Sequence, residues 1–360
     1  MSEQLRSFDG HDSEAWHRRA RRMLHAAEII PFGLSLVERF ADHHERFADD
    51  RLHVVLGGLE FENPVMVGAG WDKAGKAIGA LHRLGFTGVE VGSVLAYPQP
   101  GNAKPRQWML AAGVGLNWLG FNSPGMEAVA DNLERYRRTK VETGIVGISI
   151  GKNKHIPDID APEAYSKVAR ILYGYADYFA INVSSPTPGL RELQGKEFLT
   201  DIVQAVIDAM QEGGGRKPLF VKIAPDNLTN QDIADIIEVV TENDATGLIV
   251  ANTTVNADLK AKYGEQWRNE MGGLSGDDEE YRNMTTEMVR HIYRETGGVI
   301  DIIGVGGVKD TETALQKLKA GATVVQIVTG IRGSLPLWKA FFEQPKLPGR
   351  INRGLVEWMD

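Results

Sequence analysis

The feature that most constrains the fold is a regular alternation of short apolar, β-branched runs with longer amphipathic stretches, which begins near Pro64. This alternation is typical of βα units. Eight runs are predicted to be strands, at residues 64–68, 88–92, 145–150, 178–183, 219–223, 247–251, 301–305 and 323–328. Helices are expected near residues 74–84, 123–138, 161–174, 197–212, 230–243, 279–296, 311–320 and 335–343.

Eight βα units over about 280 residues predict an α/β fold, the (β/α)8 TIM barrel, whose strands are buried on both faces and therefore read as continuous apolar runs. A doubly wound sheet is the alternative. It does not require eight units, and its first strand is usually followed by the glycine pattern GxGxxG, whereas this chain has GAGWDKAG there. We therefore expect the barrel to span residues 56–360.

Residues 1–55 form a separate N-terminal helical extension in this interpretation. Apolar side chains recur at helical spacing up to Ile30, Pro31 and Gly33 interrupt the pattern, and it resumes from Leu34 to Phe40. Two short amphipathic helices follow from this spacing. Two roles remain open: a cap packed on the barrel, or an element that contacts a membrane surface through residues 1–50, since basic amphipathic helices suit anionic headgroups.

The composition excludes several classes of protein. The formal charge of −8 gives no electrostatic basis for wrapping nucleic acid. The absence of cysteine rules out disulfides, a thiolate nucleophile and Cys-ligated metal in this chain. No apolar run approaches the ~18 residues of a spanning helix, and the first residues lack the apolar core of a signal peptide. We expect a cytoplasmic protein, with peripheral contact at the inner face of the cell membrane as the variant.

Polar residues follow nearly every predicted strand, at the end of a barrel where active sites lie. Lys73 and Lys222 imply an anionic or electron-rich ligand, or else structural ion pairs with Asp72 or Asp226. Asn182 and Asn252 are either turn or cap residues or they bind a planar ligand with alternating donors and acceptors. The glycines after strand seven and the Thr-Gly pair after strand eight suit a phosphate, although glycines are also ordinary turn residues.

Motifs for other chemistries are missing from the sequence. It contains no GxSxG, HExxH, Walker A or EF-hand pattern, so serine hydrolase, zinc protease and P-loop functions lack support. No metal site is expected.

Ten segments in order resemble one family, the flavin-dependent dihydroorotate dehydrogenases of the membrane-associated, quinone-using class. They lie within residues 57–332 and read GLEFENPVMVGAGWDKAG, VEVGSVLAYPQPGNAKPR, GLNWLGFNSPG, GISIGKNK, INVSSPTPGLRELQ, VKIAPD, ANTT, GGLSG, IIGVGGV and AGATVVQI. The resemblance implies an FMN-binding (β/α)8 barrel that oxidises dihydroorotate to orotate in pyrimidine biosynthesis and passes electrons to a quinone. The soluble class uses a cysteine base, which this chain does not have.

The resemblance also implies residue roles. Ser185 would take the C5 proton, assisted by Thr187 or water, while hydride passes from C6 to flavin N5. Lys73 would bridge flavin and substrate, and Lys222 would stabilise the reduced flavin. The implied cofactor-binding residues are Ala69, Gly70, Lys73, Ser93, Ser149, Asn182, Lys222, Ala251, Gly276, Gly306, Gly307, Val328 and Thr329. The implied substrate-binding residues are Lys73, Asn117, Gly120, Phe121, Asn182, Asn252 and Thr253.

Several positions depart from the family pattern. The loop reads SSPTPGLR where the family has SSPNTPGLR, which removes one asparagine. Ser149 replaces another asparagine, Ala251 a threonine, and Val328 an aromatic residue. Each lost amide would leave a ligand group unpaired at ~1–3 kcal/mol. Two alternatives therefore stay open: an FMN oxidoreductase of the same lineage acting on another small planar substrate, and a flavin-binding protein without turnover.

Overall fold

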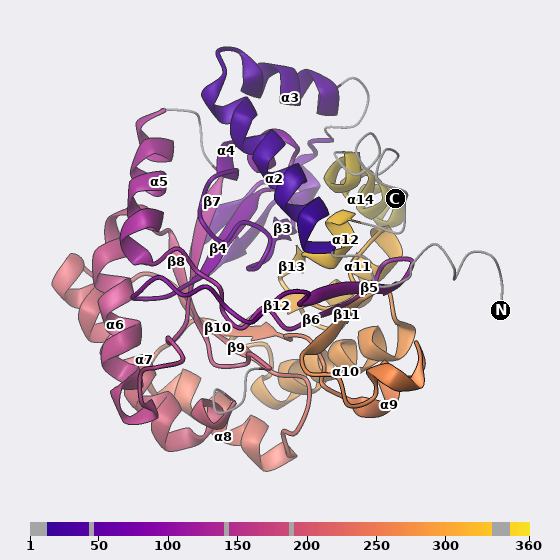
Figure 1. Cartoon of the computed structure of the whole chain (residues 1–360). Coiled ribbons are helices and arrows are strands. Elements are labelled where there is room, and N and C mark those ends of the chain that lie inside the picture. Colours follow the sequence, from indigo (N-terminus) through magenta and orange to yellow (C-terminus); the bar gives the residue numbers. More distant parts are fainter. Residues whose placement is uncertain (1–12, 43–46, 140–143, 187–190, 333–345) are drawn as a thin grey trace.

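A closed barrel of eight parallel strands forms the centre of the molecule (Figure 1). The computed structural model describes residues 13–42, 47–139, 144–186, 191–332 and 346–360. Strand β13 pairs with β3 through Val325 and Val65, which closes the ring. All eight predicted barrel strands are confirmed. They are β3 (Val65–Val67), β4 (Gly88–Val94), β7 (Ile145–Ile150), β8 (Tyr178–Asn182), β9 (Leu219–Ile223), β10 (Gly247–Val250), β12 (Asp301–Val305) and β13 (Val324–Ile327).

Helices cover the outside of the barrel because each carries one apolar face toward the strands. Seven of the predicted helices are confirmed: α4 (Ile78–Arg83), α5 (Met126–Arg138), α6 (Ala161–Leu172), α7 (Lys196–Gly213), α8 (Asn230–Glu242), α10 (Glu279–Thr296) and α11 (Thr311–Lys319). The helix predicted near 335–343 lies outside the described residues. Shorter or later elements are α9 (Ala257–Ala261), α12 (Thr329–Arg332), α14 (Leu347–Met359), η1 (Asp50–Leu52), η2 (Asp158–Asp160), η3 (Tyr173–Tyr175), η4 (Glu192–Gln194) and η5 (Glu265–Trp267).

A hairpin closes the barrel at the end where the strands begin. It consists of β1 (Val54–Leu56) and β2 (Leu59–Phe61), joined by Gly57 and Gly58. Both glycines have positive φ, 59° and 76°, which a two-residue hairpin turn of this kind requires. The side chains of Leu56 and Phe61 are buried against the lower barrel core. This hairpin was not predicted, although the LGGL sequence carries its turn signal.

A three-stranded antiparallel sheet lies at the opposite end, and we call it the roof sheet. Its strand order is β11 (Gly273–Gly276), β6 (Val114–Asn117) and β5 (Gln107–Ala111). It has its own apolar cluster, which includes Trp108, Leu116 and Leu274 and extends to α9 and α10. The roof sheet was not predicted either, because two of its three strands, β6 and β11, have only four residues each and contain glycine.

The N-terminal extension forms the two predicted helices, α2 (Ser13–Ile29) and α3 (Gly33–Asp42), and both pack against α4. Glu28 of α2 accepts the amide of Ala80 at 3.0 Å, and His25 Nδ1 lies 2.8 Å from the Lys76 carbonyl. At the start of α2, Glu14 receives two hydrogen bonds from the buried Arg106 guanidinium, at 2.8 and 3.0 Å. The helices thus cap the barrel, as one of the two interpretations expects.

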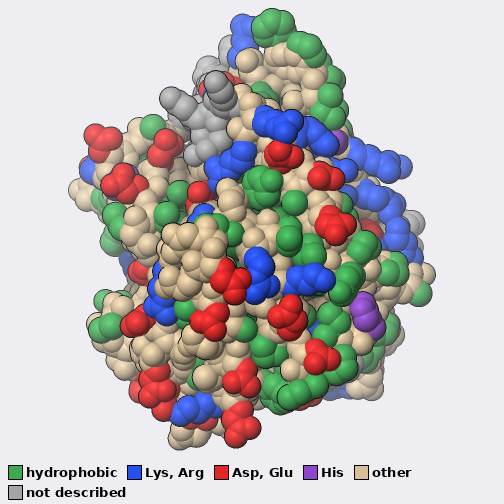
Figure 2. All heavy atoms as spheres, turned by 90° about the vertical axis from the view of Figure 1, so that its left-hand side faces the viewer, with side chains coloured by type: hydrophobic (Ala, Val, Ile, Leu, Met, Phe, Trp, Pro, Cys, Tyr) green, Lys and Arg blue, Asp and Glu red, His purple; other side chains and the backbone are tan. Residues whose placement is uncertain are grey.

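The outer face of this pair stays apolar. Figure 2 shows hydrophobic side chains at the top of the molecule, where α3 lies, with basic side chains beside them. The exposed residues are Met23, Ile29, Ile30, Phe32 and Leu36, and Phe32 is 87% exposed. Among the described residues, no helix combines the length and the apolarity that crossing a bilayer demands.

Candidate active site

A cavity of about 1450 Å³, its open mouth included, lies between the ends of the barrel strands, the roof sheet and α2. The predicted site residues converge on it. Those that line it are Ala69, Gly70, Lys73, Ser93, Asn117, Gly120, Phe121, Asn182, Ser185, Lys222, Ala251, Asn252, Thr253, Gly276, Gly306, Gly307, Val328 and Thr329. Ser149 is the exception. It is fully buried behind the wall, where its hydroxyl lies 2.9 Å from that of Ser93.

A hydrogen-bond network joins the ends of the barrel strands β4, β8 and β10. Asn182 donates from Nδ2 to Ser93 Oγ at 2.8 Å, and its Oδ1 accepts the Ser184 hydroxyl at 3.0 Å. Asn252 continues the network, because its Nδ2 donates to Ser184 Oγ at 2.9 Å. Two buried tyrosines hold the backbone beneath: Tyr165 donates to the Asn182 carbonyl and Tyr281 to that of Asn252. Both predicted amides are therefore rigidly oriented.

Ser185 directly follows this network and lies on the cavity wall, with only 6% of its surface exposed. Its neighbour Ser184 is fully buried and serves the network rather than the cavity. Thr187, which was predicted to assist Ser185 in taking the proton, lies outside the described residues. The geometry separates the two adjacent serines into one that supports the network and one that faces the cavity.

Lys73 extends from the end of β3 into the cavity and donates to Asn122 Oδ1 at 2.6 Å. Burial, together with the nearby Arg106 guanidinium, lowers its pKa to about 7. The proposed structural partner Asp72 is occupied elsewhere, since its carboxylate accepts the amide of Ala77 at 2.7 Å. Lys73 is therefore available for an anionic ligand.

Lys222 pairs with a residue that the sequence interpretation missed. Its Nζ lies 3.9 Å from Oε1 of Glu90, which is fully buried in β4, and not against Asp226. Burial lowers the pKa of Lys222, and the Glu90 carboxylate opposes that shift. Glu90 also accepts from Tyr178 at 2.9 Å and from Gln326 at 2.7 Å. The sequence did carry a signal for this ion pair, namely a glutamate inside the apolar run GVEVGSV. A carboxylate buried in such a strand needs a partner.

Glycines shape the far end of the cavity, beside β11 and the loops after β12 and β13. Gly276, Gly306 and Gly307 have φ of 98°, 106° and 79°, a region that other residues rarely adopt. A Cβ on Gly276 would lie 2.0 Å from the Gly113 carbonyl oxygen, and one on Gly307 2.7 Å from Arg282 Cβ. The hydroxyls of Ser275 and Thr329 lie 2.9 Å apart at the same end. Bare backbone beside two hydroxyls is the usual composition of a barrel phosphate site.

Four buried polar atoms on the wall have no hydrogen-bond partner within the described part of the chain. They belong to roof-sheet, loop and barrel residues, and are Gln107 Oε1, Trp118 Nε1, Thr253 Oγ1 and Gln326 Oε1. Buried polar groups are ordinarily paired, so this set calls for a ligand with both donors and acceptors. A flavin ring carries both, and its phosphate ester fits the glycine-lined end. The residues present therefore fit FMN. No cluster of metal-binding side chains occurs among the described residues.

Comparison with known proteins agrees with this geometry. The family model described as dihydroorotate dehydrogenase matches residues 51–359. The chain belongs to the dihydroorotate dehydrogenase family. A relative from Christiangramia forsetii, named dihydroorotate dehydrogenase (quinone), is 40% identical over 312 residues, which are 86% of each chain. A relative of the same name from Thermobifida fusca is 38% identical over 96% of this chain and 88% of its own.

Solved structures of this dehydrogenase family share the fold. The crystal structure of DHODH from Eimeria tenella in complex with ferulenol has a TM-score of 0.80 and 31% identity, over 96% of this chain and 91% of that one. The ligand-free form from the same organism has a TM-score of 0.76 at 32% identity. The barrel and its N-terminal helical extension are thus those of the family.

Proposed function

We propose that this protein oxidises dihydroorotate to orotate with FMN as cofactor and a quinone as electron acceptor. One observation carries the proposal. In a member of the dihydroorotate dehydrogenase family, Ser185, Lys73 and Lys222 lie on the wall of a single cavity, together with the two asparagines held by the network. A binding protein without turnover has no use for a candidate base at this position.

FMN would supply the hydride acceptor when bound. The glycine-lined end of the cavity would hold its phosphate, and Lys222 would face the ring and favour negative charge on it. The Glu90 carboxylate, 3.9 Å from Nζ of Lys222, opposes the lowering of that pKa by desolvation and so favours the charged form. The ring edge would also pair the amide of Gln326, whose Oε1 has no hydrogen-bond partner among the residues that the structure describes.

The serine base is assigned to Ser185. A hydroxyl is a weak base, so its contribution depends on alignment with the C5 proton and on a route by which the proton leaves. The hydrogen bonds between Ser184 and Asn182 fix the backbone that precedes Ser185. Water at the cavity mouth or Thr187 would carry the proton onward.

The other predicted residues bind the substrate. The ammonium of Lys73 would meet the carboxylate of dihydroorotate. Asn117 of the roof sheet and the two network asparagines would read the ring amides from both sides, because all three line the same cavity. The ring would then lie with one face toward Ser185 and the other toward the flavin.

A quinone would reach the flavin after orotate leaves. We place its approach beside α2, because Trp16 and His17 of that helix line the cavity mouth. The exposed apolar side chains of α2 and α3 suit peripheral contact with a membrane, where quinones reside.

In this proposal residues 1–55 form the capping element and residues 56–360 the FMN-binding barrel.

The experiment is an anaerobic absorbance spectrum of the purified protein before and after addition of dihydroorotate. Loss of the flavin band near the usual ~450 nm supports cofactor, substrate and the reductive half-reaction together. An unchanged flavin band assigns the protein to the alternative of a different planar substrate. Protein that contains no flavin and fails to bind added FMN contradicts the proposal.

A further inference from the structure

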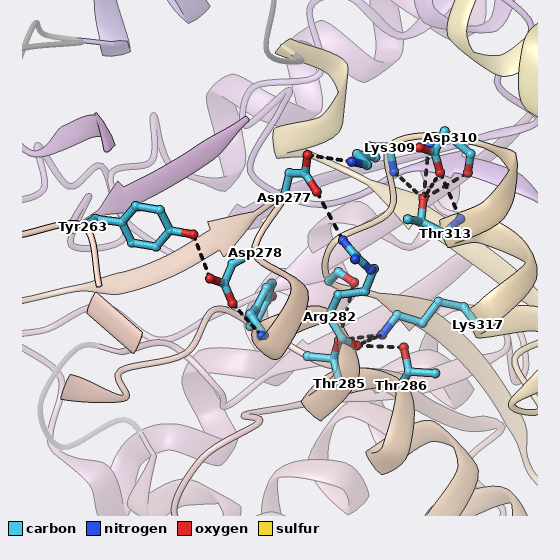
Figure 3. A network of polar contacts seen from close by, with 12 residues as sticks. Tyr263, Asp277, Asp278, Arg282, Thr285, Thr286, Lys309, Asp310, Thr313 and Lys317 are labelled. Atoms are coloured by element: carbon cyan, nitrogen blue, oxygen red, sulfur yellow. Dashed lines mark hydrogen bonds and ion pairs between the residues drawn. The ribbon is translucent and has the colours of Figure 1, made fainter. Parts of the chain in front are cut away.

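Lys317 of α11 is fully buried behind the glycine-lined end of the cavity. Figure 3 shows its side chain reaching across to α10, where it meets Thr285. Its Nζ donates to Thr285 Oγ1 at 2.5 Å and lies 3.4 Å from the Arg282 carbonyl oxygen. A completely buried lysine is rare unless it is paired with an acid, so the position of Lys317 behind the cavity needs an explanation.

Thr285 connects this lysine to the predicted phosphate loop. Its hydroxyl donates to the Arg282 carbonyl at 3.0 Å and lies 3.4 Å from the Gly306 carbonyl oxygen. A Cβ added to Gly306 would lie only 2.8 Å from Thr285 Oγ1, which shows how closely the threonine supports that glycine. Lys317 therefore fixes the position of Thr285, and Thr285 fixes the position of the loop.

Charge around this end is unbalanced. The carboxylate of Asp277 is shared by two cations, since it accepts from Arg282 at 3.2 Å and from Lys309 at 2.6 Å (Figure 3). Lys317 makes no ion pair within the described residues, and burial together with Arg282 holds its pKa well below the usual value. Asp310 is engaged in the cap of α11 with Thr313. Arg282 and Lys309 thus share a single carboxylate, and an anion in the cavity would offset the excess positive charge.

We propose that Lys317 is a positioning residue that, through Thr285 and Gly306, makes the cavity select a flavin carrying a phosphate ester over one without it. The inference rests on the proposed use of FMN. The lysine acts at a distance, because Thr285 and the loop separate it from the cavity. Through its hydrogen bond to Thr285 it supports the shape of the loop that would hold the phosphate.

The test compares flavin affinities of apoprotein prepared from wild type and from Lys317→Met, an unbranched apolar replacement. The ligands are FMN and riboflavin, which lacks the phosphate. We expect the Kd for FMN to rise at least about tenfold, because the buried hydrogen bond that holds Thr285 against the loop is lost, with the Kd for riboflavin changed less than about twofold. The matched control is Lys319→Met, which removes an exposed ammonium, stacked on Trp358, from the same helix.

The outcomes separate the inference from the proposed cofactor. Equal loss of affinity for both flavins, or no loss, overturns the role of Lys317 while the FMN proposal stands. Wild-type protein that binds neither flavin overturns the cofactor and the inference with it. If Lys317→Met does not fold, as judged by its melting curve, Thr285→Val gives the same comparison and should also lower the affinity for FMN alone. In the double variant the effects should be less than additive, since both residues act through one contact.

Discussion

Adjacent residues in the site have different tasks, and Ser184 and Ser185 show this most clearly. Replacing Ser185 by Ala should slow flavin reduction by dihydroorotate by about 10²–10⁴-fold at pH 7–9, the usual worth of a positioned base. Anaerobic stopped-flow absorbance measures that rate. Ser166→Ala is the control, because its hydroxyl bonds only within α6. Unchanged flavin reduction in Ser185→Ala would remove the base assignment.

The pKa of Lys73, lowered to about 7, predicts a pH dependence of ligand binding. An anionic ligand favours the ammonium, so above pH 7 the free protein must take up a proton to bind it, and affinity falls up to tenfold per pH unit. Below pH 7 affinity stays level. The nearby carboxyl of Glu14, whose pKa is lowered by the Arg106 guanidinium, stays ionised over this range. Titrating orotate at pH 6.0–8.5 measures the slope.

Lys73→Met should bind orotate weakly at every pH and give a flat profile. A wild-type profile that is also flat would show that the ammonium is not the group that binds the carboxylate.

Single residues of the cavity wall could be predicted where a polar side chain follows an apolar strand. The ion-pair partner of a residue could not be predicted where it lies far away in the sequence. Lys73, Asn182 and Asn252 could be found because strand ends share one edge of a barrel. Asp72 and Asp226 were the two candidate ion-pair partners for the lysines, but Lys222 lies nearest Glu90, on a strand that is not adjacent to β9. Contact across a barrel interior depends on strand register and tilt, which a single sequence does not contain.

At the scale of elements, α2 is docked partly through a carboxyl group in an apolar setting. Burial raises the pKa of Glu28 to about 7, so the folded state holds its proton more tightly than the unfolded chain does. The contribution of Glu28 to the free energy of unfolding is therefore fully present below pH 4.5, the pKa of the carboxyl in the unfolded chain. It is lost as the pH rises to about 7, the pKa in the folded protein. Glu28→Gln should raise stability at pH 8 by about 1–3 kcal/mol and change little at pH 4.5.

Melting curves at the two pH values measure this effect, and hydrogen exchange locates it in α2. Glu38→Gln on α3 is the matched control, because it removes an ion pair with Arg83 at 2.9 Å and should give no gain. A gain of equal size at pH 4.5 and pH 8 in Glu28→Gln would contradict the linkage.

The long elements were predictable and the short antiparallel ones were not. Strands such as Ile145–Ile150 are buried on both sides, so their apolar runs stand out from the amphipathic helices between them. The roof sheet has short strands, and Gly115 of β6 and Gly276 of β11 leave little side-chain pattern to detect. These strands carry Gln107, Asn117 and Ser275 to the cavity wall, so part of its polar lining depends on elements that local pattern does not reveal.

At the scale of the whole molecule, the apolar face of the helical pair predicts association with lipid. The triple variant Ile29→Ser, Phe32→Ser, Leu36→Ser should reduce binding to anionic vesicles at least about tenfold, since each side chain contributes up to ~1.5–3 kcal/mol when buried. Flavin reduction by dihydroorotate should be unchanged. Vesicle sedimentation measures the first and stopped-flow absorbance the second.

The control for lipid binding is Ile159→Ser, Val299→Ser, which replaces two residues that are 79% and 83% exposed elsewhere on the molecule. Equal vesicle binding by the triple variant and by wild type would leave α2 and α3 with the capping role alone.

The roof sheet has a consequence for how the cavity behaves over time. Its apolar cluster is separate from the two clusters inside and around the barrel, and it contains fewer buried residues than either of them. A unit with a small core of its own opens locally at a lower free energy than the ring beneath it. We therefore expect the roof sheet to open before the barrel strands do, which would give the proposed cofactor a way in while the barrel stays folded.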